Sequence, residues 1–218
     1  MEKLFLDYNF LLKNELKSKG YIVLNKKEIK DALTVSTEAF EDYELYRYIK
    51  PKFNLKHWIT FKNSVYKAMY KDMVIFTDPT RSCCCGVCCN IYRGTKNSSY
   101  IANGILKSVF TLGWKAIKKF SKFDKFILEL RRKHTNLDCI YGFDISVKKS
   151  EQGKGIGKNI NNLLQQFCDK YQRDMFLETL SKRNAEYYQK LGYQLVEEVK
   201  LPDAQDITVY CFMYIHKK

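Results

Sequence analysis

The sequence predicts a mixed α/β (α+β) fold in which helices and strands intersperse along one chain of 218 residues. Apolar side chains recur at helical spacing in residues 1–20 and 103–133. Short apolar runs that are typical of strands occupy residues 73–77 and 137–147. In residues 145–158 a strand leads through a glycine-rich turn into a helix. Together these observations indicate a sheet flanked by helices.

The composition is ordinary for a soluble globular protein, with 45% hydrophobic and 28% charged residues. No stretch approaches the roughly 20 apolar residues that a membrane span needs. Glu2 and further polar residues interrupt the N-terminus, so it does not resemble a signal peptide. We therefore expect a cytoplasmic protein with no membrane partner.

The formal net charge of +14 would suit nucleic acid, an anionic surface or a phosphorylated ligand. The lysines are scattered nearly end to end, however, as on a solvated surface. The densest patch, residues 115–133, carries eight basic and two acidic residues, with apolar residues at helical spacing. That pattern predicts a helix packed on the domain with its lysines in solvent, so nucleic acid is not the expected partner.

Five of the eight cysteines lie in the run from Cys83 to Cys89. Cys85 and Cys88 have C-x-x-C spacing, but no second pair follows at the distance of a zinc site. Side chains alternate along a strand, so Cys85 and Cys88 would face opposite sides of a sheet. We therefore expect buried core thiols, and no metal, rather than a metal site or an acylated cluster.

The first half of the chain is expected to begin with an amphipathic helix over residues 1–20, an N-terminal extension that packs on the domain. Asn25 and Glu28 have the spacing of a capping box and predict a helix to about Phe40. The other expected elements are a strand at 21–24, a helix at 55–70, a hairpin of 73–77 with the Cys-rich run to residue 92, and a polar loop at 94–99.

The second half is expected to form one domain with the rest of residues 21–218, with a basic helical insert at about 103–133. Gly113 is the expected break in that insert. The remaining predicted elements are a strand at 137–147, a helix from the glycine turn to about 171, a strand at 175–179, a helix at 184–191 ended by Gly192, and strands at 193–199 and 208–214.

The glycine turn has the chemistry of a pyrophosphate cradle. Glycines let backbone approach a ligand closely, and the unpaired N–H groups of a helix start favour an anion. The spacing is not that of a Walker A loop, because Gly157-Lys158 is followed by Asn159 rather than Ser or Thr. Nor is it a Rossmann fingerprint, since Gly153, Gly155 and Gly157 have G-x-G-x-G spacing late in the chain.

Gln152, Gly155 and Gly157 match the acetyl-CoA signature of the GNAT superfamily of N-acetyltransferases, in which a Gln or Arg is followed at fixed spacing by two small residues. A second block about twenty residues later, with Asn184, Tyr188 and Leu191-Gly192-Tyr193, resembles the next motif of that superfamily. Leu177-Glu178-Thr179 and the basic insert resemble in particular the branch that contains puromycin N-acetyltransferase.

The resemblance implies a twisted, mostly antiparallel sheet that is splayed at the cofactor strand and flanked by helices. It also implies that acetyl-CoA binds along the end of that strand, on the glycine turn and near Asn184. The implied cofactor-binding residues are Ile145, Ser146, Val147, Gln152, Gly153, Lys154, Gly155, Ile156, Gly157, Lys158 and Asn184. Asn184 could instead be only a helix N-cap.

By the same resemblance, Tyr188 would protonate the leaving thiolate, which suits a phenol with a pKa of about 10; the alternative is a core aromatic. Many relatives use a Glu as base where this chain has Tyr141. Asp144, on the same strand with the opposite alternation, and His134 are candidates for the base. Glu178 is preferred because it lies within a matched motif. A backbone N–H near Ser146 or Val147 would meet the oxyanion.

The implied reaction is direct transfer of acetyl from acetyl-CoA to a primary amine, without a metal. One alternative is a non-catalytic CoA-binding or interaction module on the same fold, and another is a basic nucleic-acid-binding protein. The acceptor stays open among small amines, antibiotic-like compounds, peptide N termini and protein lysines.

Overall fold

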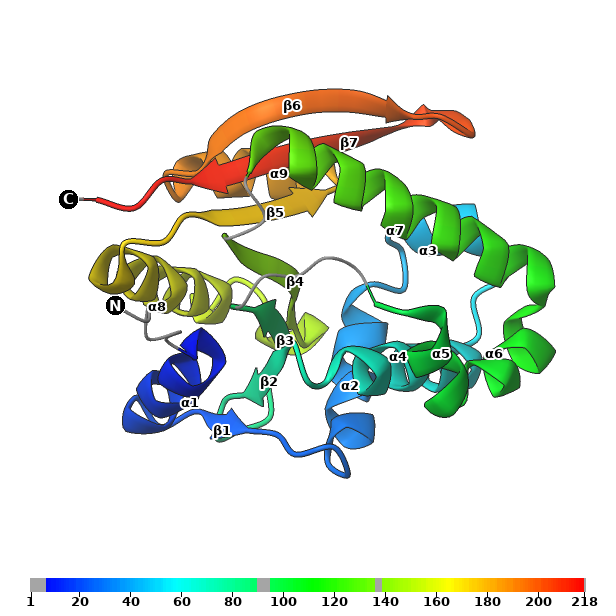
Figure 1. Cartoon of the computed structure of the whole chain (residues 1–218), viewed down its shortest axis with the longest axis horizontal. Coiled ribbons are helices and arrows are strands. Elements are labelled where there is room, and N and C mark those ends of the chain that lie inside the picture. Colours follow the sequence, from blue (N-terminus) through cyan, green and yellow to red (C-terminus); the bar gives the residue numbers. More distant parts are fainter. Residues whose placement is uncertain (1–6, 90–94, 136–138, 218) are drawn as a thin grey trace, which may run out of the picture.

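Seven strands form one sheet in the part of the chain that the computed structural model describes, residues 7–89, 95–135 and 139–217. The strand order is β1-β2-β3-β4-β5-β7-β6, and all neighbours are antiparallel except β4 and β5 (Figure 1). The strands are β1 (Ile22–Val23), β2 (Val74–Thr77), β3 (Cys83–Cys88), β4 (Ile140–Val147), β5 (Met175–Thr179), β6 (Gln194–Leu201) and β7 (Ala204–Tyr214).

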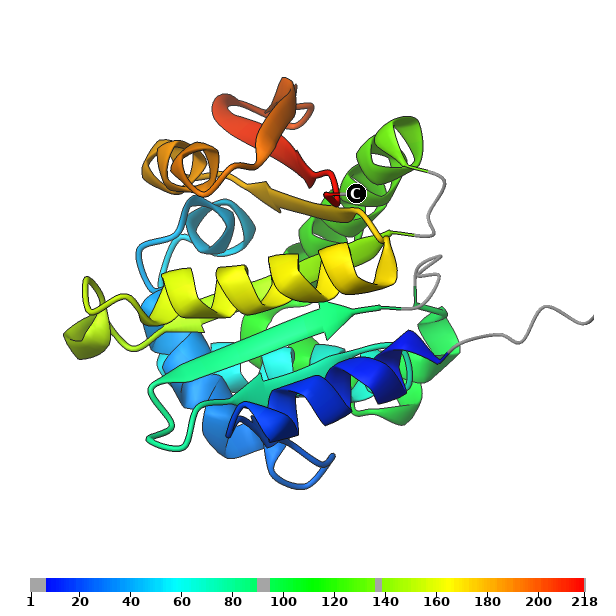
Figure 2. The same ribbon diagram turned by 90° about the vertical axis from the view of Figure 1, so that its left-hand side faces the viewer.

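Helices cover both faces of this sheet. They are α1 (Tyr8–Ser18), α2 (Ile29–Ala39), α3 (Glu44–Ile49), α4 (Leu55–Met69), α5 (Asn97–Ala102), α6 (Ile105–Leu112), α7 (Trp114–His134), α8 (Ile156–Tyr171) and α9 (Lys182–Lys190), with a 3-10 turn at Lys149–Glu151. In Figure 2, α1 and α8 lie in front of the strands. Buried side chains of α2, α3, α4, α6 and α7 form the core on the opposite face.

The sheet opens between its two parallel strands. Only two residue pairs join β4 to β5, Ile140 with Met175 and Tyr141 with Phe176. Beyond Tyr141 the strands diverge, as the splayed sheet of the family resemblance implies (Figure 1). Backbone groups at the end of β4 are therefore left without a partner strand on that side, where a ligand can pair with them.

A β-bulge bends β4 shortly after the sheet opens. Gly86 of β3 lies opposite Asp144, whereas the next residue, Val87, lies opposite Gly142, so Phe143 is an extra residue on β4. A bulge shifts the alternation of the side chains that follow it. The bulge therefore determines which side chains of β4 face α4 and α7.

The cysteine-rich strand has the predicted alternation. Cys83 and Cys85 pack in the cluster beneath α1 and α8, whereas Cys84 and Cys88 pack in the cluster on the opposite face. All eight cysteines are buried as free thiols. Cys85 and Cys88 thus face opposite sides of the sheet, and Asn90 to Tyr92 lie outside the described residues.

Local signals position several elements as the sequence predicts. The Glu28 carboxylate accepts a hydrogen bond from the Asn25 backbone N–H at 2.8 Å, as in a capping box, although α2 begins only at Ile29. Leu12 and Leu16, one turn apart on α1, are fully buried, so this helix packs on the sheet. Gly113 separates α6 from α7. The separation of residues 1–20 as an extension stays a prediction.

Three predictions about elements were incomplete or wrong. The helix α3 was missed, because six residues carry too little periodicity to stand out. The polar loop predicted at 94–99 contains the start of α5 at Asn97, and residue 94 itself lies outside the described part. The strand predicted from residue 137 begins at Ile140, because Cys139 is a bend, and residues 136–138 lie outside the described part.

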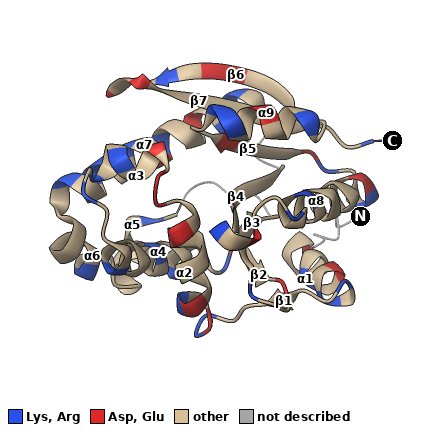
Figure 3. Cartoon of the chain, turned by 180° about the vertical axis from the view of Figure 1, so that it is seen from behind, with Lys and Arg blue, Asp and Glu red and all other residues tan. Residues whose placement is uncertain are grey.

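Basic residues are spread over several helices rather than gathered on one surface (Figure 3). Lys122 pairs with Asp203 at 2.6 Å and Lys133 with Glu197 at 2.6 Å, so lysines of α7 partly face acidic residues of the β6–β7 ribbon. The apolar side of α7 buries Phe123, Ile127 and Leu130, as predicted for a helix packed on the domain. No helix of the described residues is long and apolar enough to cross a membrane.

Candidate active site

The glycine turn between β4 and α8 is a tight loop held by its own side chains. The Gln152 side-chain amide donates to the Val147 carbonyl at 3.1 Å and so closes the loop onto the end of β4. Gly153 and Gly155 have φ values of 80° and 84°, a backbone conformation that costs other residues energy. Glycine is therefore required at both positions by the course of the backbone.

The start of α8 is open to a ligand. Gly155 is the N-cap and has no side chain to accept the first N–H groups of the helix. Gly157 has an ordinary φ, but a β-carbon there would lie 3.2 Å from the Tyr187 hydroxyl. The third glycine thus allows the Tyr187 hydroxyl of α9 to lie against the helix start. Unpaired N–H groups and the positive end of a 16-residue helix favour an anion at this place.

A cleft of about 1560 Å³, part of it open to solvent, runs along this turn; we call it the glycine-loop cleft. Ten of the eleven residues predicted to bind a cofactor line it: Ile145, Ser146, Val147, Gln152, Gly153, Gly155, Ile156, Gly157, Lys158 and Asn184. Lys154 does not line the cleft, since its ammonium group contacts the Glu151 carboxylate at 3.0 Å.

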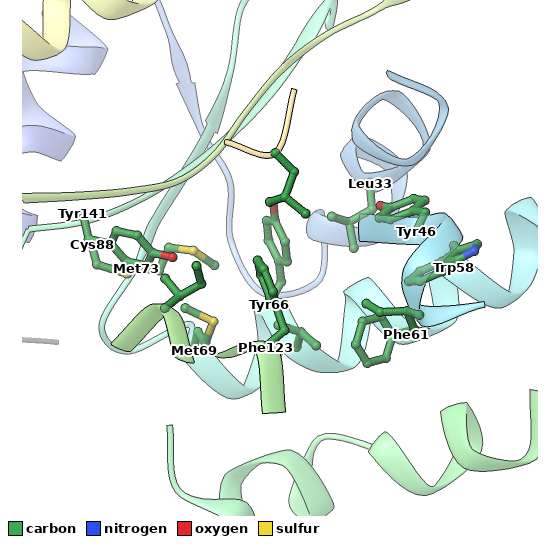
Figure 4. Close-up of a cluster of buried hydrophobic side chains, with 14 of the residues drawn as sticks. Leu33, Tyr46, Trp58, Phe61, Tyr66, Met69, Met73, Cys88, Phe123 and Tyr141 are labelled. Atoms are coloured by element: carbon green, nitrogen blue, oxygen red, sulfur yellow. The ribbon is translucent and has the colours of Figure 1, made fainter. Parts of the chain in front are cut away.

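A second cavity of about 1030 Å³, again partly open, lies between β4, β5, α4 and α7; we call it the aromatic pocket. Several of its rings are gathered from separate elements in one buried cluster (Figure 4). Its ring-bearing lining residues are Phe40, Tyr43, Tyr46, Trp58, Phe61, Tyr66, Phe120, Phe123, Tyr141, Phe143 and Tyr188.

The cleft and the pocket meet at the start of α9. Asn184 and Tyr188, one helical turn apart, line both cavities, together with Phe40, Tyr43 and Ile145. The Ser181 hydroxyl accepts from the Asn184 backbone N–H at 3.5 Å, so Ser181 is the N-cap of α9 and Asn184 is not. The side chain of Asn184 is therefore available to contact a ligand in either cavity.

Tyr188 is held by its neighbours on the sheet side. Its ring centroid lies 5.5 Å from that of Tyr193 and 5.9 Å from that of Phe212. Burial raises the pKa of its hydroxyl, so the group is protonated at neutral pH. The structure thus combines the two interpretations of Tyr188, because the ring packs on the core while the residue lines the junction of both cavities.

Glu178 lies in the aromatic pocket with one oxygen engaged. The Tyr141 hydroxyl donates to Glu178 Oε1 at 3.0 Å, and Arg131 Cζ lies 4.8 Å from the centre of the Tyr141 ring. The other oxygen, Oε2, is buried and has no hydrogen-bond partner among the described residues. Burial raises the pKa of Glu178 to about 7, although the Tyr141 hydrogen bond and the charge of Arg131 act in the opposite direction. A carboxyl with this pKa can accept a proton near neutral pH.

Asp144 reaches the same pocket, which corrects the prediction that it faces away from Tyr141. The bulge at Phe143 brings both side chains to one side of β4. The Asp144 carboxylate then accepts hydrogen bonds at Oδ2 from Ser36 Oγ at 2.6 Å and from Lys62 Nζ at 2.9 Å, and a further one from the Tyr66 hydroxyl. Nothing in the sequence of β4 marks a bulge, so this cluster was missed.

Lys62 is almost enclosed by the aromatic pocket. Only 11% of its side chain is exposed, and its ammonium nitrogen lies 5.0 Å from the Phe40 ring centre and 5.9 Å from that of Tyr46. Burial alone would lower the pKa of Lys62, but the charge of Asp144 outweighs it and the net shift is upward. The pair is therefore an ion pair, surrounded by rings that favour a cation.

His134, the remaining candidate base, lies at the end of α7 and pairs with Glu197 of β6. It lines neither the glycine-loop cleft nor the aromatic pocket. No group of His, Cys, Asp and Glu side chains among the described residues has the geometry to hold a metal ion.

No protein-family profile matches the chain, and no curated protein matches it in sequence. Solved structures do match. The C-terminal condensation domain of Ebony, in complex with beta-alanyl-dopamine, has a TM-score of 0.61 at 9% identity, over 89% of this chain and 97% of that one. Arylalkylamine N-acetyltransferase 2 from Aedes aegypti has a TM-score of 0.57 at 12% identity, over 90% and 98%.

A Corynebacterium glutamicum protein described as histone acetyltransferase HPA2 and related acetyltransferase has a TM-score of 0.58 at 14% identity, over 91% of this chain and 96% of that one. At such identities the likeness concerns the fold. The chain has the fold of the GNAT N-acetyltransferases, with a mostly antiparallel sheet that opens at the strand before the glycine turn.

Proposed function

We propose that this protein is an N-acetyltransferase that moves an acetyl group from acetyl-CoA to a primary amine. The observation that carries the proposal is the meeting of the glycine-loop cleft and the aromatic pocket at Asn184 and Tyr188. A transferase of this kind needs an anion-binding groove for the donor and a separate site for the acceptor, joined where the reacting atoms meet. The fold is that of enzymes named for amine acetylation.

The residues of the glycine-loop cleft suit CoA. The uncapped start of α8 and Lys158 would hold the pyrophosphate. The unpaired edge of β4 at residues 145–147 would pair with the amides of the pantetheine arm, with Asn184 across from it. The co-substrate would supply a thioester, whose carbonyl would then lie beside the aromatic pocket.

The chemistry then uses groups at the junction. The acceptor amine must be neutral to attack, and Glu178, with a pKa of about 7, takes its proton directly or through water. A backbone N–H at Ser146 or Val147 stabilises the tetrahedral oxyanion. On collapse the carbon–sulfur bond would break and the Tyr188 hydroxyl would give its proton to the departing thiolate, while the proton that the amide nitrogen loses would return to Tyr188 through water. An amide and free CoA result.

A second candidate is amide formation from a donor other than acetyl-CoA, or CoA binding without catalysis. Amide formation is favoured by the likeness to the Ebony domain, which is described as a condensation domain. Titration of CoA into the protein by calorimetry, followed by an assay of free thiol released from acetyl-CoA with a panel of amines, distinguishes these functions.

For the acetyltransferase we expect CoA binding and amine-dependent thiol release. Lys158→Ala, in the cleft, should weaken CoA binding by about fivefold, the size of one exposed charge contact. Lys170→Ala serves as the control, because Lys170 lies at the far end of the same helix and pairs with Glu15. Binding of CoA without turnover would support the non-catalytic module. The absence of CoA binding would exclude both the acetyltransferase and the CoA-binding module, and would leave amide formation from another donor.

A further inference from the structure

Three carboxyl side chains from three different elements line the aromatic pocket, namely Asp124 of α7, Asp144 of β4 and Glu178 of β5. One cationic side chain, Lys62, lines it as well, and that cation is already paired with Asp144. Besides burial, the charge of Asp124 raises the pKa of Glu178, and the charge of the buried Arg131 lowers the pKa of both carboxyls. Three carboxylates thus face two cations, Lys62 and Arg131, so the ionised groups in and around the pocket sum to one net negative charge.

This acidic character comes with an unfilled hydrogen-bonding capacity. Glu178 Oε2 is buried without a hydrogen-bond partner among the described residues, and so is Asp144 Oδ1, because the donors around Asp144 converge on its other oxygen. Only 7% of Asp144 is exposed. Buried acceptors without donors are costly and uncommon, and a ligand that brings several N–H donors relieves the cost.

The rest of the wall is apolar and built of rings. Phe120 and Phe123 come from α7, Phe61 from α4 and Phe143 from the bulge of β4. Rings of this kind bury an apolar body favourably, and their faces attract a cation. Lys62 and Arg131 offset two of the three carboxylates, so a second ammonium group on the ligand would be buried with no carboxylate left to pair with it.

We propose that the acceptor is a small primary amine with one positive charge and a ring-sized apolar body, whose amino group binds at Glu178 opposite Asp124 while the body lies among the rings. This inference rests on the proposed function only in naming the pocket as the acceptor site. Burial raises the pKa of Asp124 to about 6, against the effect of the Arg131 charge, and the group is still mostly ionised at pH 7.5.

The test is binding of probe compounds to the full chain without acetyl-CoA, measured by calorimetry at pH 7.5. We expect 2-phenylethylamine to bind at least about tenfold more tightly than 2-phenylethanol, which lacks the charge, and than spermidine, which lacks the ring. Equal binding of the alcohol would overturn the role of the carboxylates. Tighter binding of spermidine would contradict the requirement for an apolar body and would favour a polyamine as the acceptor.

Two α7 variants sharpen the result. Asp124→Asn keeps the shape of the side chain and should weaken 2-phenylethylamine binding by about fivefold, without changing the binding of the alcohol. Glu129→Gln removes an exposed carboxylate from the same helix outside the pocket and should change neither. Equal losses for both variants, or a loss for the alcohol as well, would contradict the proposal.

The outcome is separable from that of the proposed function. If 2-phenylethylamine binds as expected but no acetyl-CoA is consumed, the pocket is an amine site and the acetyltransferase proposal fails. If acetyl-CoA is consumed only with spermidine or a peptide amine, the acetyltransferase stands and the acceptor class proposed here is wrong. A circular dichroism melt of each variant confirms that it is folded.

Discussion

The two cavities of this protein were built in different ways. The glycine-loop cleft takes seven of its lining residues from one continuous segment, 151–158, and its geometry follows from glycine spacing and the start of one helix. The aromatic pocket takes its walls from α3, α4, α7, α9, β4 and β5, and its lining residues are spread between Phe40 and Tyr188. A binding site made of local backbone is visible in a sequence, whereas one made of side chains from six elements is not.

The same difference separates their energetics. In the cleft, the ligand-binding groups are backbone N–H groups and glycines, so a substitution there changes binding more than packing. In the pocket, the polar groups are buried beside rings, so a substitution there changes stability as well as binding. Variants of the two regions test this contrast.

The largest effect is expected in the cleft. Gly157→Asp places a β-carbon beside the Tyr187 hydroxyl and a negative charge where the pyrophosphate would lie. CoA affinity should fall by on the order of 10³-fold, because like charges held together cost several kcal/mol. Calorimetry with CoA measures the loss. Asn159→Asp adds the same charge two residues further along α8, outside the cleft, and should retain CoA binding.

A large loss of stability is expected in the pocket. Lys62→Met removes the ammonium group from the buried Asp144 carboxylate and should cost about 3–5 kcal/mol of unfolding free energy. Urea unfolding measures it. Lys62→Met combined with Asp144→Asn should recover part of the loss, because no buried charge remains. Lys56→Met, at an exposed position of the same helix, should be nearly neutral. An equally mild effect of Lys62→Met would show that the pair is not buried in solution.

A loss of catalysis is expected at the junction. Tyr188→Phe keeps the ring that packs on Tyr193 and Phe212 but removes the transferable proton. Turnover should fall by roughly 10²-fold, which is typical for losing a general acid, while acetyl-CoA affinity stays nearly unchanged. Steady-state kinetics with one amine measures both. If Tyr188→Phe retains normal turnover and only Tyr188→Ala is damaging, through stability, the residue is a core aromatic.

A smaller, pH-dependent effect is expected for Glu178. Its pKa of about 7 in the folded protein lies above its ordinary 4.5, so the native state holds its proton more tightly than the unfolded chain. Stability should therefore fall as pH rises from about 4.5 to 7. Besides burial, Tyr141, Arg131 and Asp124 change the pKa of Glu178 by a hydrogen bond or by their charge. In addition to burial, the charge of Glu178 in turn raises the pKa values of Tyr43, Tyr188 and Cys211.

Glu178→Gln removes this titration. At pH 8 the variant should be more stable than the native protein by on the order of 2 kcal/mol, which is less than the full pKa shift would give because Glu178 is partly exposed. At pH 5 the two proteins should be about equally stable. Urea unfolding at the two pH values measures the difference. Glu186→Gln, an exposed carboxyl of α9, should show no such dependence. A constant difference for Glu178→Gln across this range would exclude the raised pKa as its cause.

By itself, the sequence determined what depends on neighbours along the chain. The α/β class, the alternation of Cys83 to Cys89, the break at Gly113 and the glycine turn follow from periodicity and backbone preferences that act within a few residues. The ten cofactor-binding candidates that line one cleft were accessible for the same reason, since most of them occupy one turn.

Only the tertiary structure decided the aromatic pocket. The bulge at Phe143 turns Asp144 toward Lys62, and neither residue carries a local signal of the other, 82 positions away. The exclusion of His134 from both cavities depends likewise on its pairing with Glu197 of β6. A buried charge is tolerated only where distant elements supply its partner, so packing between elements, rather than sequence spacing, set the chemistry of the aromatic pocket.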